Sequence, residues 1–303
     1  MADTALGDDA VDGEEPKRAT VSVSVAISSA LPRSINQAKH RLACYLVAFI
    51  SIYWGPLLGA TLIPVKHKEG VSHGFIVLHS EDGRRLATGD MIQTVEGGRV
   101  TSEVVLHFAD GSVHDEVTVF SQNHEFRLIR DTLHQHGPSF PHPVDVSIDV
   151  PSGTVKVRSE TDGKNKSQER HIDMPDDVAT GMALTLVKNI PASAPETTIS
   201  IVTTGPKPQV IKLKIHSEGE RLFWSGGEAH KAIHYVVHAD IPGLKGAVAP
   251  LVGKQPPDTH VWVLGGKAPT FVKFEGPLYE QGPIWVVDLA PLKWSGDNPN
   301  PGK

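Results

Sequence analysis

The chain has 303 residues, a formal net charge of −6 and a sequence pI near 6.2. This mild acidity argues against a nucleic-acid partner, because a protein that binds nucleic acid needs a basic face to neutralise phosphates. The single cysteine, Cys44, lies in an apolar stretch, so the rest of the chain has no residues for a disulfide or a thiolate metal site.

The N-terminal region predicts a leader. Residues 1–20 are acidic and nearly free of large apolar side chains, and we predict a disordered extension over residues 1–41. Residues 42–65 contain no charge and follow Lys39-His40-Arg41, a pattern typical of a signal peptide or a membrane anchor rather than of a buried core element. Their late position leaves open a start downstream of Met1. We expect export to the periplasm or cell envelope, soluble if 42–65 is cleaved and membrane-anchored if it is retained.

From residue 66 the chain reads as short strands separated by turns. Alternating apolar and polar residues predict seven strands in the first half, at 71–79, 85–95, 99–108, 112–120, 126–133, 144–150 and 154–159. Asp82-Gly83, Gly97-Gly98 and Asp110-Gly111 mark hairpin turns, because glycine tolerates positive φ. Strands at this spacing without helices between them predict an antiparallel sheet.

Residues 176–190 have helical periodicity instead. Met182, Leu186 and Ile190 recur every four residues, and Pro191 would end the helix. We predict one substantial helix here, with its apolar face buried on the concave side of a curved sheet.

The second half returns to strands, predicted at 197–204, 210–216, 221–224, 232–239, 260–264, 271–275 and 284–289. Glu218-Gly219-Glu220 is predicted as a hairpin turn, 244–252 as a loop or short helix, and 293–303 as a disordered tail. The predicted fold class is mainly β: a large curved antiparallel sheet or partly open β-barrel in a single domain of residues 66–292, with one substantial helix.

Several segments resemble known bacterial proteins. GVSHGF, GRVTSEVVLHFADGSVHDEVTVFSQ, GPSFPHPVDVSID and GKQPPDTHVW resemble uncharacterised exported bacterial β-proteins over about residues 63–290. The order of leader, antiparallel meander, helix and closing strands (HYVVHADI, HVWVLGGKAPTFVKFEGPL, IWVVDL) resembles the LolA/LolB-like periplasmic lipoprotein-carrier fold. The first resemblance implies no named activity, and fold likeness alone transfers no function.

Sixteen histidines raise the hypothesis of a metal site. His134 and His136 are two residues apart and on a strand would share a face, and His142 and Asp145 would complete a His₃-carboxylate set. We favour exposed histidines at the rim of a turn, because this spacing matches no known zinc motif.

A second polar pair, His114 and Glu116, would suit acid–base chemistry. We predict instead that both face solvent, with Val113, Val117 and Val119 toward the core. The chain has no HExxH motif and no GxSxG nucleophile elbow, because its GVSHG at 70–74 leads into a predicted strand rather than turning from a strand into a helix. We therefore predict no catalytic residue, no cofactor and no enzyme.

The loop at 137–143, GPSFPHP, holds Phe140 at its tip, either as a packed crossover or as a gate. Phe140, Met182 and Leu186 are the candidates for a ligand cavity or its mouth. The main hypothesis is an exported envelope protein that binds a lipid or acyl chain within the curved sheet, without catalysis. The alternatives are a structural or interaction β-domain without a ligand, and a metal-dependent hydrolase using His134, His136 and His142. A cavity above about 300 Å³ would favour the carrier.

Overall fold

The computed structural model describes residues 62–161, 164–205, 207–225, 228–241 and 256–290. The predictions for 1–41, most of 42–65, 244–252 and 293–303 lie outside these residues. In the part of the chain that is described, no helix is long and apolar enough to cross a membrane.

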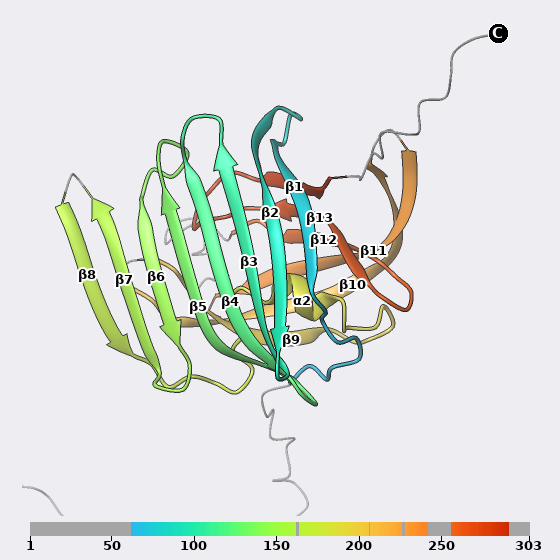
Figure 1. The fold of residues 1–303 in the computed structure, drawn as a ribbon, viewed down its shortest axis with the longest axis horizontal. Helices are drawn as coiled ribbons and strands as arrows, with labels where there is room; N and C mark the ends of the chain where they lie inside the picture. The colour runs from blue at the N-terminus through green and yellow to red at the C-terminus, as the bar shows by residue number, and fades with distance from the viewer. Residues whose placement is uncertain (1–61, 162–163, 206, 226–227, 242–255, 291–303) are drawn as a thin grey trace, which may run out of the picture. The chain divides into compact units, whose positions relative to one another are not determined.

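The described residues form one antiparallel sheet of fourteen strands, which confirms the predicted fold class (Figure 1). The strands of the first half are β1 (Ser72–Ser80), β2 (Arg85–Glu96), β3 (Arg99–Phe108), β4 (Val113–Gln122), β5 (Phe126–His136), β6 (Val144–Asp149), β7 (Thr154–Thr161) and β8 (Lys164–His171). Those of the second half are β9 (Thr197–Val202), β10 (Val210–Ser225), β11 (Glu228–Asp240), β12 (Thr259–Leu264), β13 (Thr270–Gly276) and β14 (Trp285–Leu289).

Neighbours in the sheet are neighbours in the chain, with one exception. The order runs from β8 down to β1, then β14, and from there down to β9. The first and last strands thus meet in the middle of the sheet, while β8 and β9 form its two open edges. The three hairpins that join β1 to β4 follow predicted glycine turns, as at Gly97 and Gly98, where φ is +55° and +80°.

The sheet curves so that its two halves share one hydrophobic core. In Figure 1 the strands β9–β13 pass behind the half formed by β1–β8, with helix α2 (Ala183–Val187) between them. A wide sheet with one apolar face has to curl to bury that face. The largest fully buried apolar side chains come from both halves and include Ile76, Leu78, Leu106, Phe120, Ile148, Ile199, Ile215 and Tyr235.

The predicted helix at 176–190 is wrong in extent, because only the five residues of α2 are helical. Before it, Val178 forms a bridge with Ser200 of β9, and Asp177 Oδ1 accepts a 2.6 Å hydrogen bond from the hydroxyl of Ser200. Gly181 then has a φ of +72°, which a right-handed helix cannot contain. Turns, rather than a long helix, therefore bury the periodic apolar residues of this segment.

Two strand predictions also need correction. Residues 218–220 are not a hairpin turn, because β10 continues through them with a β-bulge and pairs with β11 as far as Ser225 and Glu228. Strand β8 was not predicted, since its sequence KNKSQERH lacks apolar residues. A charged edge strand of this kind pairs through its backbone and discourages pairing with other chains.

The folded domain begins before the predicted boundary at residue 66. Ile63 is buried in the core, and Pro64 forms a β-bridge with Glu125. The end of the apolar stretch, Leu62–Val65, therefore belongs to the β-domain.

Candidate functional site

A cavity of about 840 Å³ lies within the curved sheet, bounded by residues of both halves and of the segment around α2. Most of its lining is apolar, and the side chains that contribute include Ile76, Val104, Leu106, Leu133, Val261 and Phe274. Ligand sites have this character: a volume of about 300–1,000 Å³ and an apolar wall with a few polar groups.

Two polar residues of the cavity wall, His114 and Glu116, come from β4, and the prediction for this strand was wrong. His114 and Thr118 are 5% and 2% exposed and face inward, and Glu116, which lies between them, lines the cavity. Val113 and Val117 lie on the other face and keep part of their surface exposed. β5 supplies polar partners directly across the strand pair for two of the inner residues, Gln135 for His114 and Asp131 for Thr118, whereas Glu116 lies opposite Leu133.

A β-bulge in β5 sets which of its residues face inward. Val119 pairs with Arg130 and Phe120 pairs with Leu128, so Ile129 is an extra residue on β5. The extra residue reverses the alternation of faces that follows it. Phe126 and Leu128 face inward before the bulge, whereas Asp131, Leu133 and Gln135 face inward after it.

Glu116, which is partly buried, and Asp131 form an acidic pair. Asp131 is fully buried; its Oδ1 accepts a 2.8 Å hydrogen bond from the hydroxyl of Thr118, and its Oδ2 has no partner among the described residues. Burial and the neighbouring carboxylate raise the pKa of Glu116 to about 8, and burial raises the pKa of Asp131 to about 6. The pair therefore holds at least one proton near neutral pH.

Gly181 brings the chain just before α2 onto this pair. A Cβ atom at this position would lie 2.2 Å from Thr118 Oγ1, 2.5 Å from Asp131 Oδ1 and 3.3 Å from Glu116 Oε1. Only glycine therefore fits this close approach, and its positive φ also favours glycine.

His114 is the second titratable group on this face. The side-chain amide of Gln135 lies 2.9 Å from His114 Nδ1 and donates a 2.7 Å hydrogen bond to the carbonyl of Leu278. Burial lowers the pKa of His114 to about 4, so the imidazole is neutral at physiological pH. The inner face of β4 thus carries a neutral imidazole beside a carboxyl group that retains its proton.

The chain segment before β1 forms part of the cavity wall, from Lys66 onward. Asn189 holds it in place: its Oδ1 accepts hydrogen bonds from the backbone N–H of Lys66 at 3.0 Å and of His67 at 2.8 Å. The Lys188 ammonium also lies 2.7 Å from Glu69 Oε1, and both side chains are largely buried. These contacts attach the segment to the residues that follow α2.

None of the three predicted cavity residues lines the cavity. Phe140 is 2% exposed and makes edge contacts with Phe108, Tyr279 and Trp285, which supports the packed-crossover interpretation of its loop. Met182 and Leu186 are buried in the core at 1% and 3% exposure. Other residues of their segment line the cavity instead: Gly181, Ala183, Leu184, Thr185 and Lys188.

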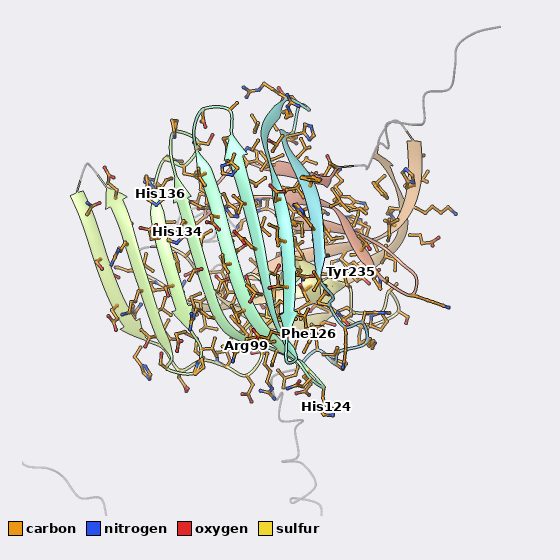
Figure 2. All side chains as sticks on the ribbon, viewed as in Figure 1. Arg99, His124, Phe126, His134, His136 and Tyr235 are labelled. Atoms are coloured by element: carbon orange, nitrogen blue, oxygen red, sulfur yellow. The ribbon has the colours of Figure 1, made fainter. Side chains whose placement is uncertain are left out.

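Three of the four predicted metal ligands come together, on the outer face of β5 and β6. His134, His136 and Asp145 place one ligand atom each within 4.8 Å of the others. Figure 2 labels the two histidines. His142 is exposed and does not belong to this group.

No sequence signal singled out Asp131, Gly181 or Gln135. Asp131 sits in the predicted strand FRLIRDTL, whose alternation gives no indication of the bulge at Ile129. The contact of Gly181 with β4 and β5 joins segments far apart in the chain. Only the tertiary structure shows these residues as a group.

The fold and the cavity define a class: an open, curved antiparallel β-sheet protein with an internal, mostly apolar cavity. No protein-family model and no curated protein matches the chain. Among solved structures, it is similar to a β-barrel-like protein of domain of unknown function DUF1849 from Brucella abortus, with 10% identity, a TM-score of 0.35 and coverage of 74% of this chain and 100% of that one. It is also similar to the hypothetical lipoprotein YmcC from Escherichia coli, with 10% identity, a TM-score of 0.32 and coverage of 88% and 100%. Neither is described as a LolA- or LolB-type carrier.

Proposed function

We propose that this protein binds an apolar or amphiphilic ligand, such as a lipid or acyl chain, in the cavity of its curved sheet, and that it does so without catalysis. The observation that carries the proposal is the cavity of about 840 Å³ with its mostly apolar wall. This volume exceeds the value of about 300 Å³ expected of a ligand site. A purely structural β-domain would have no need of such a space.

Burial of hydrocarbon accounts for useful affinity. Each buried methylene contributes about 0.8 kcal/mol, so ten of them give about 8 kcal/mol. That corresponds to a dissociation constant near 1 μM before the costs of ordering the ligand.

The acidic pair restricts the charge of the ligand. Glu116 lines the cavity beside the buried Asp131, and an anionic group placed against them would be repelled. A neutral end is compatible with a protonated Glu116, which would donate a hydrogen bond to a ligand oxygen. The proposed ligand therefore has an apolar body and an uncharged group next to β4.

The test compares two adjacent valines of β3. Val104 lines the cavity, whereas Val105 lies on the other face of the same strand. Titration of the full chain with a neutral pyrene-labelled acylglycerol is expected to show one probe per chain. Val104→Trp, which fills cavity space, should weaken binding at least about tenfold, because a clash of little more than 1.4 kcal/mol is enough.

Val105→Trp is the matched control and should bind as the wild type does. Circular dichroism and the urea midpoint of both variants establish that they are folded. Failure of the wild type to bind, or equal binding by the two folded variants, would refute the proposal.

A further inference from the structure

Two histidines of β5 point away from the cavity. Side chains alternate between the faces of a strand, and Leu133 and Gln135 are buried on the inner face, so His134 and His136 share the outer one. Each of the two imidazoles keeps 54% of its side-chain surface exposed. Both rings are therefore accessible to an ion from solvent (Figure 2).

The carboxylate of Asp145 lies between these imidazoles. Asp145 of β6 is the direct cross-strand neighbour of His134. Its Oδ1 is 2.7 Å from His134 Nδ1 and 2.8 Å from His136 Nε2. Ligand atoms about 2.0–2.2 Å from a tetrahedral ion are about 3.3–3.6 Å apart. Small rotations of these exposed side chains are enough to reach that spacing.

We propose that His134, His136 and Asp145 form a binding site for one divalent late transition metal, Cu²⁺, Ni²⁺ or Zn²⁺, on the outer face of the sheet. Two imidazole nitrogens with one carboxylate oxygen suit these ions, whereas Mg²⁺ and Ca²⁺ are held mainly by oxygen ligands. Three protein ligands leave a coordination position for water or another external ligand. The site is separate from the cavity and does not depend on the function proposed for it.

Two other histidine–aspartate pairs, both among the described residues, have a single imidazole each. His73 Nε2 lies 2.6 Å from Asp90 Oδ1, and His238 Nδ1 lies 2.7 Å from Asp258 Oδ1. Within the described ranges, His134, His136 and Asp145 are the one group of three that could hold an ion together. The chain therefore supplies its own single-imidazole controls.

The location favours binding over hydrolysis. The cavity is lined by Leu133 on the inner face of β5, and His134, His136 and Asp145 are not part of its wall. A bound ion would cross-link β5 and β6 without enclosing a substrate. The proposed site is therefore a site for metal binding and differs from the alternative hypothesis of a metal-dependent hydrolase.

The test is titration of the tag-free, EDTA-treated full chain with Cu²⁺, Ni²⁺, Zn²⁺ and Mg²⁺ by isothermal calorimetry at pH 7.5. We expect one tight Cu²⁺ per chain, weaker Ni²⁺ and Zn²⁺, and no Mg²⁺. His134→Gln and His136→Gln should each lower Cu²⁺ affinity at least about tenfold, because even groups outside the first shell contribute about 10–100-fold. His73→Gln and His142→Gln should leave it unchanged.

A measurement on the wild type complements the variants. Substoichiometric Cu²⁺ should broaden ¹⁵N–¹H resonances of β5 and β6 before those of other strands, because paramagnetic broadening is local. The proposal is overturned if the double variant His134→Gln/His136→Gln keeps the wild-type affinity, if His73→Gln loses as much as His134→Gln, or if the broadening is centred elsewhere.

Discussion

The hydroxyl of Thr118 on β4 donates a 2.8 Å hydrogen bond to Oδ1 of Asp131 on β5, and the two residues are direct cross-strand partners. This bond lowers the pKa of Asp131, but burial outweighs it and the pKa is raised overall. Glu116, two residues before Thr118 on the same face, adds a second carboxyl group. The acidic pair is thus a destabilising element that the fold retains beside its cavity.

Glu116→Gln should stabilise the protein increasingly as pH rises. The pKa of Glu116 is raised from 4.5 to about 8, so between these values the folded state binds more protons than the unfolded state, and stability falls with rising pH. The amide does not titrate. The free energy of unfolding of Glu116→Gln should exceed that of the wild type by near zero at pH 4.5 and by on the order of 1–3 kcal/mol at pH 8. Urea denaturation of both proteins at several pH values checks this, and a difference independent of pH would contradict it.

His114→Gln should have the opposite dependence. Burial lowers the pKa of His114 from 6.5 to about 4, so in this window the unfolded state binds more protons and the wild type loses stability as pH falls. At pH 7.5 the free energy of unfolding of the variant should be about 1 kcal/mol lower than that of the wild type, because Gln135 loses a well-placed hydrogen-bond acceptor. At pH 4.5 this difference should be smaller. Urea midpoints at the two pH values test the sign, and an NMR titration should show no protonation of His114 above pH 5.

Gly181→Ala should destabilise far more than Gly83→Ala. Both glycines have positive φ, +72° and +84°, for which a non-glycine residue costs about 1–2 kcal/mol. A Cβ atom at Gly83 meets nothing within 4 Å, whereas one at Gly181 would overlap Thr118 and Asp131. Equal urea midpoints for the two variants would show that the close approach at Gly181 does not matter.

Asn189→Ala should release the segment that walls the cavity. Asn189 is 2% exposed, accepts two backbone hydrogen bonds from Lys66 and His67, and donates one to the carbonyl of Thr185. Asn189→Ala should lower the free energy of unfolding by about 1–3 kcal/mol, because buried polar groups lose their hydrogen-bond partners. Hydrogen exchange of the Lys66 and His67 amides should become faster. The same amides should be unaffected by Asn123→Ala, which alters an exposed side chain.

Binding of a neutral probe should weaken above about pH 8 if the cavity is the ligand site. Ionisation of Glu116 would place a charge in the cavity wall and favour water over hydrocarbon. Fluorescence titration between pH 6 and pH 9.5 measures the effect. Glu116→Gln should bind equally across this range, so a pH dependence that survives in the variant would have another origin.

The sequence predicted the strands well because the two signals behind them are local. Alternation and glycine turns, as at Gly97-Gly98 between β2 and β3, act over a few residues. The failures have non-local causes. β8 exists because β7 offers it a backbone edge. The start of the segment at 176–190 is held by Ser200 of β9, so that only Ala183–Val187 is helical.

The residues of the candidate sites also divide into those that local spacing predicts and those that depend on tertiary structure. His134 and His136 were predicted to share a face, because their spacing on a strand is enough to establish it. The valines of β4 suggested the wrong core face, since the inner face is occupied by polar groups with partners on β5. The bulge at Ile129 and the contact at Gly181 depend on tertiary structure, and no local pattern indicates them.

The pairing of β1 with β14 has a consequence for how the domain folds. Ile76 lies opposite Leu289, so the central strand pair joins positions more than two hundred residues apart. The meander from β1 to β8 has only local pairings and is able to form while the chain is still being synthesised. The pairing of β1 with β14 at the centre of the sheet forms only once the final strand is available. Closing such a long loop is slow, so until β14 docks, the exposed edge of β1 would be open to pairing with other chains.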